Sequence, residues 1–248
     1  MNRSERGTQE EMTTQNRAVF FDRDGVLCQA VVRDGRPCPT ASLAETQLMP
    51  GARLVCEALK NAGFLLVMIG TQQETAHGSP EAVGEMNLWL ATELGMDAVE
   101  MCPHQESDRC TCRTPAPGLL TEAAARLNIK LTDSFLVGDR WTDIEAGLRA
   151  GCRTAFIDYQ YRELRPDSPS HTAESLLDAA EYILLAEPAS TPNSAANFLM
   201  GLVARTRAVG EFHRPRVKQT RKAVELSPEV ISVQVEQKNA GEVPASVL

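Results

Sequence analysis

Short, nearly continuous runs of apolar residues recur along the chain and predict the strands of a buried sheet. The runs are AVFF at 18–21, FLLVMI at 64–69, AVEM at 98–101, SFLVG at 134–138 and TAFI at 154–157. Apolar and polar residues do not alternate strictly within them, as expected for strands that are covered on both faces. The pattern therefore predicts five strands in the interior of a domain.

Helical periodicity occupies the intervals between these strands. Apolar residues recur three to four positions apart in segments 51–62, 80–94, 117–127 and 141–150, and we expect a last helix at 172–186. Ser79 and Pro80 suit the start of the second helix, since serine caps a helix and proline tolerates its first position. Alternating strands and helices predict an α/β fold: a Rossmann-like parallel sheet with helices on both faces.

Three parts of the 248-residue chain differ in composition. Residues 1–17 are polar and predict an N-terminal tail, whereas residues 18–186 contain the α/β pattern and predict one domain. Residues 187–248 begin with a segment of linker composition and continue with a basic run, which predicts a C-terminal extension that is linker-like and partly disordered. The basic run has three open interpretations: a solvated tail, a contact with the acidic domain, or a contact with a membrane surface.

The charge of the chain excludes some classes of partner. The net charge is −8, and residues 187–248 carry eight basic and six acidic residues, which leaves 17 basic and 27 acidic residues for residues 1–186. A body with a charge of −10 is a poor partner for nucleic acid. No apolar run approaches the roughly 18 residues of a membrane span, and the N-terminus lacks the apolar stretch of a secretory signal. We expect a cytoplasmic monomer without nucleic-acid or membrane partners.

Polar residues follow four of the predicted strands where each strand ends. They are Asp22 to Asp24, Thr71 to Gln73, Cys102 to His104, and Asp139. Ligands of open α/β sheets bind beyond the carboxyl ends of the strands. The topology therefore predicts a functional site built from these four segments.

Carboxylates are concentrated in two of these segments. Asp22 and Asp24 lie in a D-x-D-G sequence in which Gly25 permits a sharp turn, and Asp139 and Asp143 flank the start of a predicted helix. The D-x-D-G sequence could alternatively be a surface turn, and Asp139 alone could be a helix N-cap. Taken together they predict a cluster of four carboxylates, which is stable only around a cation, and hard oxygen ligands suit Mg²⁺.

These motifs resemble those of the haloacid-dehalogenase-type phosphatases, which carry D-x-D-G-[VT] after the first strand and G-D-x-x-x-D after the fourth. The resemblance implies that Asp22 is a nucleophile that forms an aspartyl-phosphate and that Asp24 is the general acid/base. It also implies that Asp139 binds Mg²⁺ together with Asp22 and the backbone carbonyl of Asp24, with Asp143 in support. These roles are chemically consistent, since a carboxylate attacks a negatively charged phosphoryl group only when a metal ion neutralises both groups.

A second cluster of metal ligands lies after the third predicted strand. Its spacing is C-x-H-x5-C-x-C, and its members are Cys102, His104, Cys110 and Cys112. Three thiolates and one imidazole match a closed, structural Zn²⁺ site, the alternative being a chance cluster. The other cysteines, Cys28, Cys38, Cys56 and Cys152, are expected to be small buried residues rather than disulfides, because the cytosol is reducing.

The zinc cluster, followed by a C-R-x-P sequence, narrows the resemblance to the class IIIA subfamily. This subfamily includes heptose-bisphosphate and histidinol-phosphate phosphatases, and the similarity covers about residues 18–186. It implies a minimal cap at residues 28–50, a zinc-binding loop and a small phosphorylated sugar as substrate, with the heptose branch favoured over the histidinol branch.

The chain departs from the family pattern in its second motif, usually T-N-Q-x4-R-G. Gly70 stands at the threonine position, Thr71 at the asparagine position and His77 at the arginine position. We expect Thr71 and Gln72 to contact the phosphoryl group, with the Thr71 hydroxyl replacing the missing one.

The third motif is usually C-R-K-P and here has Thr114 in place of the lysine. Arg113 is the remaining cation of the motif, and Arg140 or His77 could supply the missing charge. We therefore expect Arg113 and Arg140 to bind the phosphoryl group. Loss of one preorganised donor costs about 3 kcal/mol of transition-state stabilisation. Two hypotheses stay open, an active phosphatase and a phosphatase-like protein that binds its ligand without efficient turnover.

Overall fold

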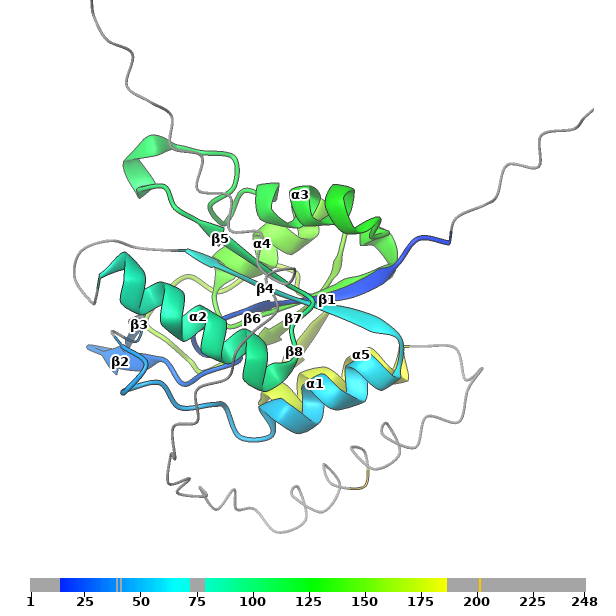
Figure 1. Cartoon of the computed structure of the whole chain (residues 1–248), viewed down its shortest axis with the longest axis horizontal. Coiled ribbons are helices and arrows are strands. Elements are labelled where there is room, and N and C mark those ends of the chain that lie inside the picture. The colour runs from blue at the N-terminus through cyan, green and yellow to red at the C-terminus, as the bar shows by residue number, and fades with distance from the viewer. Residues whose placement is uncertain (1–13, 39, 41, 72–78, 187–200, 202–248) are drawn as a thin grey trace, which may run out of the picture.

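The computed structural model describes residues 14–38, 40, 42–71, 79–186 and 201 of the chain. In this part of the chain, six parallel strands form one sheet (Figure 1). In spatial order they are β5 (Ala98–Cys102), β4 (Phe64–Thr71), β1 (Arg17–Asp22), β6 (Phe135–Gly138), β7 (Arg153–Ile157) and β8 (His171–Ala173). The sequence predicted the first five of these strands in chain order, and the fold class is confirmed.

Helices cover both faces of the sheet (Figure 1). One face packs against α1 (Ala52–Asn61), α2 (Pro80–Leu94) and α5 (Leu176–Leu185), and the other against α3 (Gly118–Leu127) and α4 (Trp141–Ala150). Successive side chains of β1 point to opposite faces, so Val19 and Phe21 join the first core and Ala18 and Phe20 the second. The apolar runs are continuous because both faces of β1 are buried.

A short hairpin interrupts the segment in which a minimal cap was expected. Strands β2 (Val31–Arg33) and β3 (Arg36–Cys38) pair in antiparallel register. They are joined by Asp34 and Gly35, which have φ values of 51° and 79°. Positive φ at both positions is typical of the two-residue turns that join hairpin strands. The insertion is small, as predicted, and it contains an ordered hairpin.

The prediction of one helix over residues 172–186 is wrong at its beginning. His171–Ala173 form strand β8, which pairs with β7, and α5 begins only at Leu176. Ser175 is the N-cap, and its hydroxyl accepts a hydrogen bond from the Asp178 amide at 3.2 Å. Three residues carry too little periodicity to predict a strand, so pairing with the sheet edge decides their conformation.

Two 3₁₀ helices, η1 (Glu106–Asp108) and η2 (Leu131–Asp133), complete the described elements. β1 begins at Arg17, one residue before the predicted domain boundary. The predicted tails lie almost entirely outside the described residues, so the division into three parts stays a prediction. No helix of the described part is both long and apolar enough to cross a membrane.

Candidate active site

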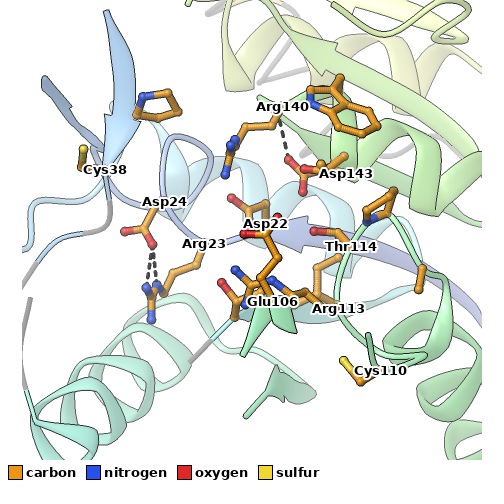
Figure 2. Close-up of a pocket in the computed structure, with 18 of the residues that line it drawn as sticks. Asp22, Arg23, Asp24, Cys38, Glu106, Cys110, Arg113, Thr114, Arg140 and Asp143 are labelled. Atoms are coloured by element: carbon orange, nitrogen blue, oxygen red, sulfur yellow. Dashed lines mark hydrogen bonds and ion pairs between the residues drawn. The ribbon is translucent and has the colours of Figure 1, made fainter. Parts of the chain in front are cut away.

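A cavity of about 610 Å³ lies at the edge of the sheet where the predicted site was expected (Figure 2). Asp22 lines it from the end of β1, Thr71 from the end of β4, and Asp143 from the first turn of α4. The β2–β3 hairpin contributes Pro37 and Cys38 to the opposite wall. Segments far apart in the sequence therefore meet at one edge, as parallel topology requires.

Three of the four predicted carboxylates converge beside this cavity. One oxygen each from Asp22, Asp139 and Asp143 lies within 4.8 Å of the others. Gly25 makes this approach possible: its φ is +86°, and a Cβ at that position would overlap the Asp139 carboxylate. The alternative interpretation of Asp139 as a helix N-cap is wrong, because Arg140 is the N-cap of α4.

Burial and mutual repulsion change the acidity of these three groups. Burial, followed by the charges of Asp143 and Asp24, raises the pKa of Asp22 well above its ordinary value. Burial and the charge of Asp22 raise the pKa of Asp139 well above its ordinary value, and burial and Asp139 raise the pKa of Asp143 to about 7. Asp139 Oδ1 is buried and has no hydrogen-bond partner among the described residues. Three crowded carboxylates with one unpaired oxygen fit a hard divalent cation such as Mg²⁺.

Asp24 does not join this cluster, so the prediction of four converging carboxylates is corrected to three. Its Oδ2 accepts hydrogen bonds from Arg23 Nε at 2.9 Å and Nη2 at 2.6 Å, and its Oδ1 accepts one from Thr40 Oγ1 at 3.1 Å. Figure 2 shows the Asp24 carboxylate turned toward Arg23 and away from Asp22. The buried Arg23 guanidinium balances the negative charge of the Asp24 carboxylate, so Asp24 does not need a metal ion for that purpose.

The partner of that arginine was not predicted. Arg23 is only 4% exposed, and its Nη1 donates a hydrogen bond to Asn87 Oδ1 at 3.0 Å. Asn87 belongs to the buried face of α2, together with the apolar residues Met86 and Leu90. A single amide within an apolar helical stripe was the sequence signal, because a buried polar group needs a partner.

Two tyrosines that follow β7 were also missed. Tyr161 donates a hydrogen bond from its hydroxyl to Asp139 Oδ2 at 3.0 Å, and Tyr159 donates one to the carbonyl oxygen of Gly25 at 3.0 Å. They lie beyond the carboxyl end of β7, at the same edge of the sheet as the other site residues. The available signal was the position of the Asp-Tyr-Gln-Tyr sequence after a predicted strand.

The residues expected to contact a phosphoryl group are described only in part. Thr71 and Thr114 both line the cavity, whereas Gln72 and His77 lie outside the described residues. A Cβ on Gly70 would lie 3.1 Å from Met101 Sδ, so the space next to this glycine is already occupied by a thioether. The Thr71 hydroxyl is thus the described candidate for the role that the family assigns to its threonine.

The two predicted phosphoryl-binding arginines have different surroundings, although both line the cavity. Arg140 forms an ion pair with Glu163, with Nη2 and Nε 2.8 and 2.9 Å from its carboxylate oxygens. Arg113 Nη1 donates to the carbonyl oxygen of His104 at 3.3 Å, and within the described residues it forms no ion pair. Arg113 is therefore the freer of the two positive charges.

The four predicted zinc ligands also come together. Their ligand atoms lie within 4.8 Å of one another, and the three thiols form no disulfide. Sγ–Sγ distances are 3.3 to 3.6 Å, and His104 Nδ1 lies 3.2 Å from Cys112 Sγ and 3.7 Å from Cys102 Sγ. Zn–S bonds of 2.3 Å in a tetrahedron place sulfur atoms about 3.8 Å apart, so the donor set and its spacing fit Zn²⁺.

The zinc-ligand loop also forms part of the cavity wall. Glu106, Arg109 and Cys110 line the cavity, and Cys112 directly precedes Arg113 (Figure 2). Among the remaining cysteines, Cys28, Cys56 and Cys152 are buried as expected, whereas Cys38 is only half-buried. Because Cys112 directly precedes Arg113, a zinc-ligand loop with a fixed conformation also fixes where the Arg113 side chain begins.

Residues 111–179 match the model of a protein family described as "HAD-hyrolase-like". The chain is 32% identical over 160 residues to the D-glycero-beta-D-manno-heptose-1,7-bisphosphate 7-phosphatase of Yersinia pestis, covering 59% of this chain and 82% of that protein. It is 28% identical over 183 residues to the protein of the same name from Pasteurella multocida, covering 67% and 96% of the two chains.

Solved structures show the same similarity. The D,D-heptose 1,7-bisphosphate phosphatase of B. bronchiseptica, solved in complex with magnesium and phosphate, superposes with a TM-score of 0.58 at 26% identity, covering 69% of this chain and 99% of that one. A HAD-like phosphatase structure from Mesorhizobium loti shares the fold with a TM-score of 0.56 at 24% identity, covering 71% and 90%.

Proposed function

Because this chain belongs to the haloacid-dehalogenase-like hydrolases and is a phosphatase, we propose that it hydrolyses a phosphomonoester through an aspartyl-phosphate on Asp22 and depends on Mg²⁺. The observation that carries this proposal is the convergence of Asp22, Asp139 and Asp143, two of which, Asp22 and Asp143, line the cavity. Asp139 and Asp143 are buried and Asp22 is partly buried, and three crowded carboxylates with raised pKa values are stabilised by a bound cation.

We propose a sugar bisphosphate such as D-glycero-D-manno-heptose 1,7-bisphosphate as the substrate. The names of the Yersinia and Pasteurella relatives support this choice over histidinol phosphate. The small β2–β3 hairpin leaves the cavity open enough for a phosphorylated sugar, and the Arg113 guanidinium is available to an anionic group.

In the proposed reaction, a carboxylate oxygen of Asp22 attacks phosphorus and the bond between phosphorus and the sugar oxygen breaks. Asp24 donates a proton to the leaving oxygen and then accepts one from a water that attacks the aspartyl-phosphate. Cleavage of the bond between phosphorus and the Asp22 oxygen releases inorganic phosphate and restores the Asp22 carboxylate. Mg²⁺, bound by Asp22, Asp139 and the backbone carbonyl of Asp24 with Asp143 alongside, would supply charge neutralisation.

The structure supports a preparatory role for Arg23 and Thr40 in this reaction. Their hydrogen bonds occupy both oxygens of Asp24 and hold its side chain in a defined orientation next to the cavity. The Asp24 carboxylate is 18% exposed and lines the cavity, so a rotation of its side chain brings it to a bound substrate.

We also propose that Cys102, His104, Cys110 and Cys112 bind a structural Zn²⁺. These four side chains would fill all four positions of a tetrahedral ion, which would leave no position for water or substrate. The ion would stabilise the loop that carries Arg113 and Thr114.

A second candidate function is ligand binding without efficient turnover. Two observations favour it. Gly70 lacks the hydroxyl of the threonine that the family usually has at this position, and Thr114 lacks the positive charge of the usual lysine. The carboxylates Asp22, Asp24, Asp139 and Asp143 are nevertheless all present, and this favours the enzyme.

The deciding experiment measures phosphate release with and without Mg²⁺ from heptose 1,7-bisphosphate, histidinol phosphate and simple sugar phosphates. We expect Mg²⁺-dependent release with the heptose bisphosphate preferred, and loss of release in Asp22→Asn. Asp133→Asn, a change of an exposed carboxylate in η2, is the matched control and should keep full activity. Release that is absent throughout, or unchanged in Asp22→Asn, would reject the enzyme.

A further inference from the structure

We propose that Tyr161 is a positioning residue of the carboxylate site: its hydroxyl orients Asp139 so that the free carboxylate oxygen faces the cation. This inference rests on the proposed Mg²⁺ site and adds a residue that neither the motifs nor the comparisons assign. Its basis is the unequal environment of the two oxygens of one side chain.

One oxygen of Asp139 is occupied by protein and the other is not. Oδ2 accepts the hydrogen bond from the Tyr161 hydroxyl at 3.0 Å. Oδ1 is buried without a hydrogen-bond partner among the described residues. A terminal carboxylate rotates over a broad range, so a hydrogen bond to one oxygen determines where the other points. A buried acceptor without a partner is costly, and a cation removes that cost.

The backbone of the D-x-D-G turn closes the same side of the carboxylate. A Cβ on Gly25 would overlap Asp139 Oδ2, which places this oxygen directly against the turn. Oδ2 is thus enclosed by Gly25 on one side and by Tyr161 on another. Oδ1, the buried oxygen without a hydrogen-bond partner among the described residues, is therefore the one that we assign to an ion shared with the clustered carboxylates of Asp22 and Asp143.

The position of Tyr161 is fixed by its surroundings, so its hydroxyl can orient Asp139. Gln160 adopts a positive φ of 57°, and its amide donates to Asp158 Oδ1 at 2.9 Å, which turns the chain between the two tyrosines. The rings of Tyr159 and Tyr161 consequently lie together, with centroids 5.6 Å apart. The ion pair of Glu163 with Arg140 ties the same segment to α4. A ligand orientation of this kind is effective only when the orienting group is rigid.

A purely structural tyrosine would show different behaviour. It would contribute to folding stability, but a folded variant without the hydroxyl would bind the cation as well as the wild type. An orienting tyrosine changes the affinity for the cation even when the protein stays folded. Partners of metal-binding carboxylates typically change metal affinity by about 10- to 100-fold.

The test is a Mg²⁺ titration of the full chain, wild type and Tyr161→Phe. Calorimetry measures the affinity, and the fluorescence of Trp141, which lines the cavity beside Asp143, gives a second reading. We expect the dissociation constant for Mg²⁺ to rise about tenfold in Tyr161→Phe. Tyr182→Phe is the matched control, because it removes the hydroxyl of a partly buried tyrosine in α5 that does not line the cavity, and its affinity should stay within about twofold of the wild type.

Circular dichroism at the titration temperature verifies that each variant is folded. Tyr161→His, which keeps a ring and an N–H donor, provides a second folded variant and should show an intermediate affinity. Unchanged Mg²⁺ affinity in Tyr161→Phe, or equal weakening in Tyr182→Phe, overturns the inference while leaving the proposed function intact. Absence of Mg²⁺ binding in the wild type overturns both.

Discussion

Arg23 neutralises Asp24 from the adjacent position in the chain, with its Nη2 2.6 Å from the carboxylate. The pair is nearly enclosed, with side-chain exposures of 4% for the arginine and 18% for the aspartate. Because buried ion pairs depend on full hydrogen bonding, the Asn87 amide oxygen on the far side of Arg23 is part of the same arrangement. A residue of α2 thereby positions the residue proposed as general acid/base.

Asn87→Leu should therefore damage both stability and turnover. The change leaves Arg23 Nη1 buried without its acceptor, which costs about 1–3 kcal/mol of unfolding free energy. We expect kcat to fall by about tenfold with a smaller effect on KM, since Asp24 acts in the chemical step. Urea denaturation and steady-state kinetics measure the two effects.

The matched control for this change is Asn87→Asp, which keeps an oxygen acceptor for Arg23. It should retain most of the stability and activity of the wild type. Equal activity in wild type and Asn87→Leu would contradict the proposed role of the α2 amide.

The Mg²⁺-free protein should lose stability as the pH rises from about 4 to 7. Burial and the neighbouring Asp139 charge raise the pKa of Asp143 to about 7 in the folded state, against 3.8 as its ordinary value. Between these values the folded chain binds more protons than the unfolded chain, so the unfolding free energy decreases with pH. The decrease is on the order of a few kcal/mol.

Thermal unfolding at pH 5 and pH 7 measures this effect. Addition of Mg²⁺ should raise the melting temperature more at pH 7 than at pH 5, because the ion binds the ionised carboxylates. Asp143→Asn should flatten the pH dependence, and a wild-type protein that is more stable at pH 7 without Mg²⁺ would be inconsistent with this account.

Purified protein should contain about one Zn²⁺ per chain. Cys110→Ser removes one of four ligands and should lower the melting temperature by roughly 5 °C or more, because binding of a structural metal adds to folding free energy. Metal analysis and thermal unfolding provide the measurements. Cys38→Ser, at a half-buried cysteine outside the cluster, is the control and should keep both zinc and stability. Metal-free wild type of unchanged stability would rule the site out.

Thr114→Lys should increase the rate of phosphate release. The change restores the cation that the family carries in its third motif, and the loss of one preorganised donor typically costs about 10²–10³ in kcat. We expect a gain of at least about tenfold in kcat. Thr111→Lys adds the same charge at an exposed position three residues earlier and should give no gain. Equal rates in wild type and Thr114→Lys would indicate that another cation already supplies this charge.

The strands and the edge of the sheet at which the site lies were predictable from the sequence because they depend on local patterns. Phe20 and Phe21 belong to a run that only a two-sided sheet buries, and Asp22 ends that run. The zinc ligands Cys102, His104, Cys110 and Cys112 were predictable for a similar reason, since their spacing lies within one short loop. In each case, residues close in the chain carry the whole signal.

The sequence by itself determined the fold class, the strand order along the chain and the chemical types gathered at one edge. Only the tertiary structure decided that Asp24 turns to Arg23, that Asn87 completes this pair and that Tyr161 holds Asp139. The contacts of Asn87 and Tyr161 join segments far apart in the chain, and the strength of all three contacts depends on burial, which no local pattern reports. The same holds for β8, whose three residues become a strand only because β7 presents a free edge to them.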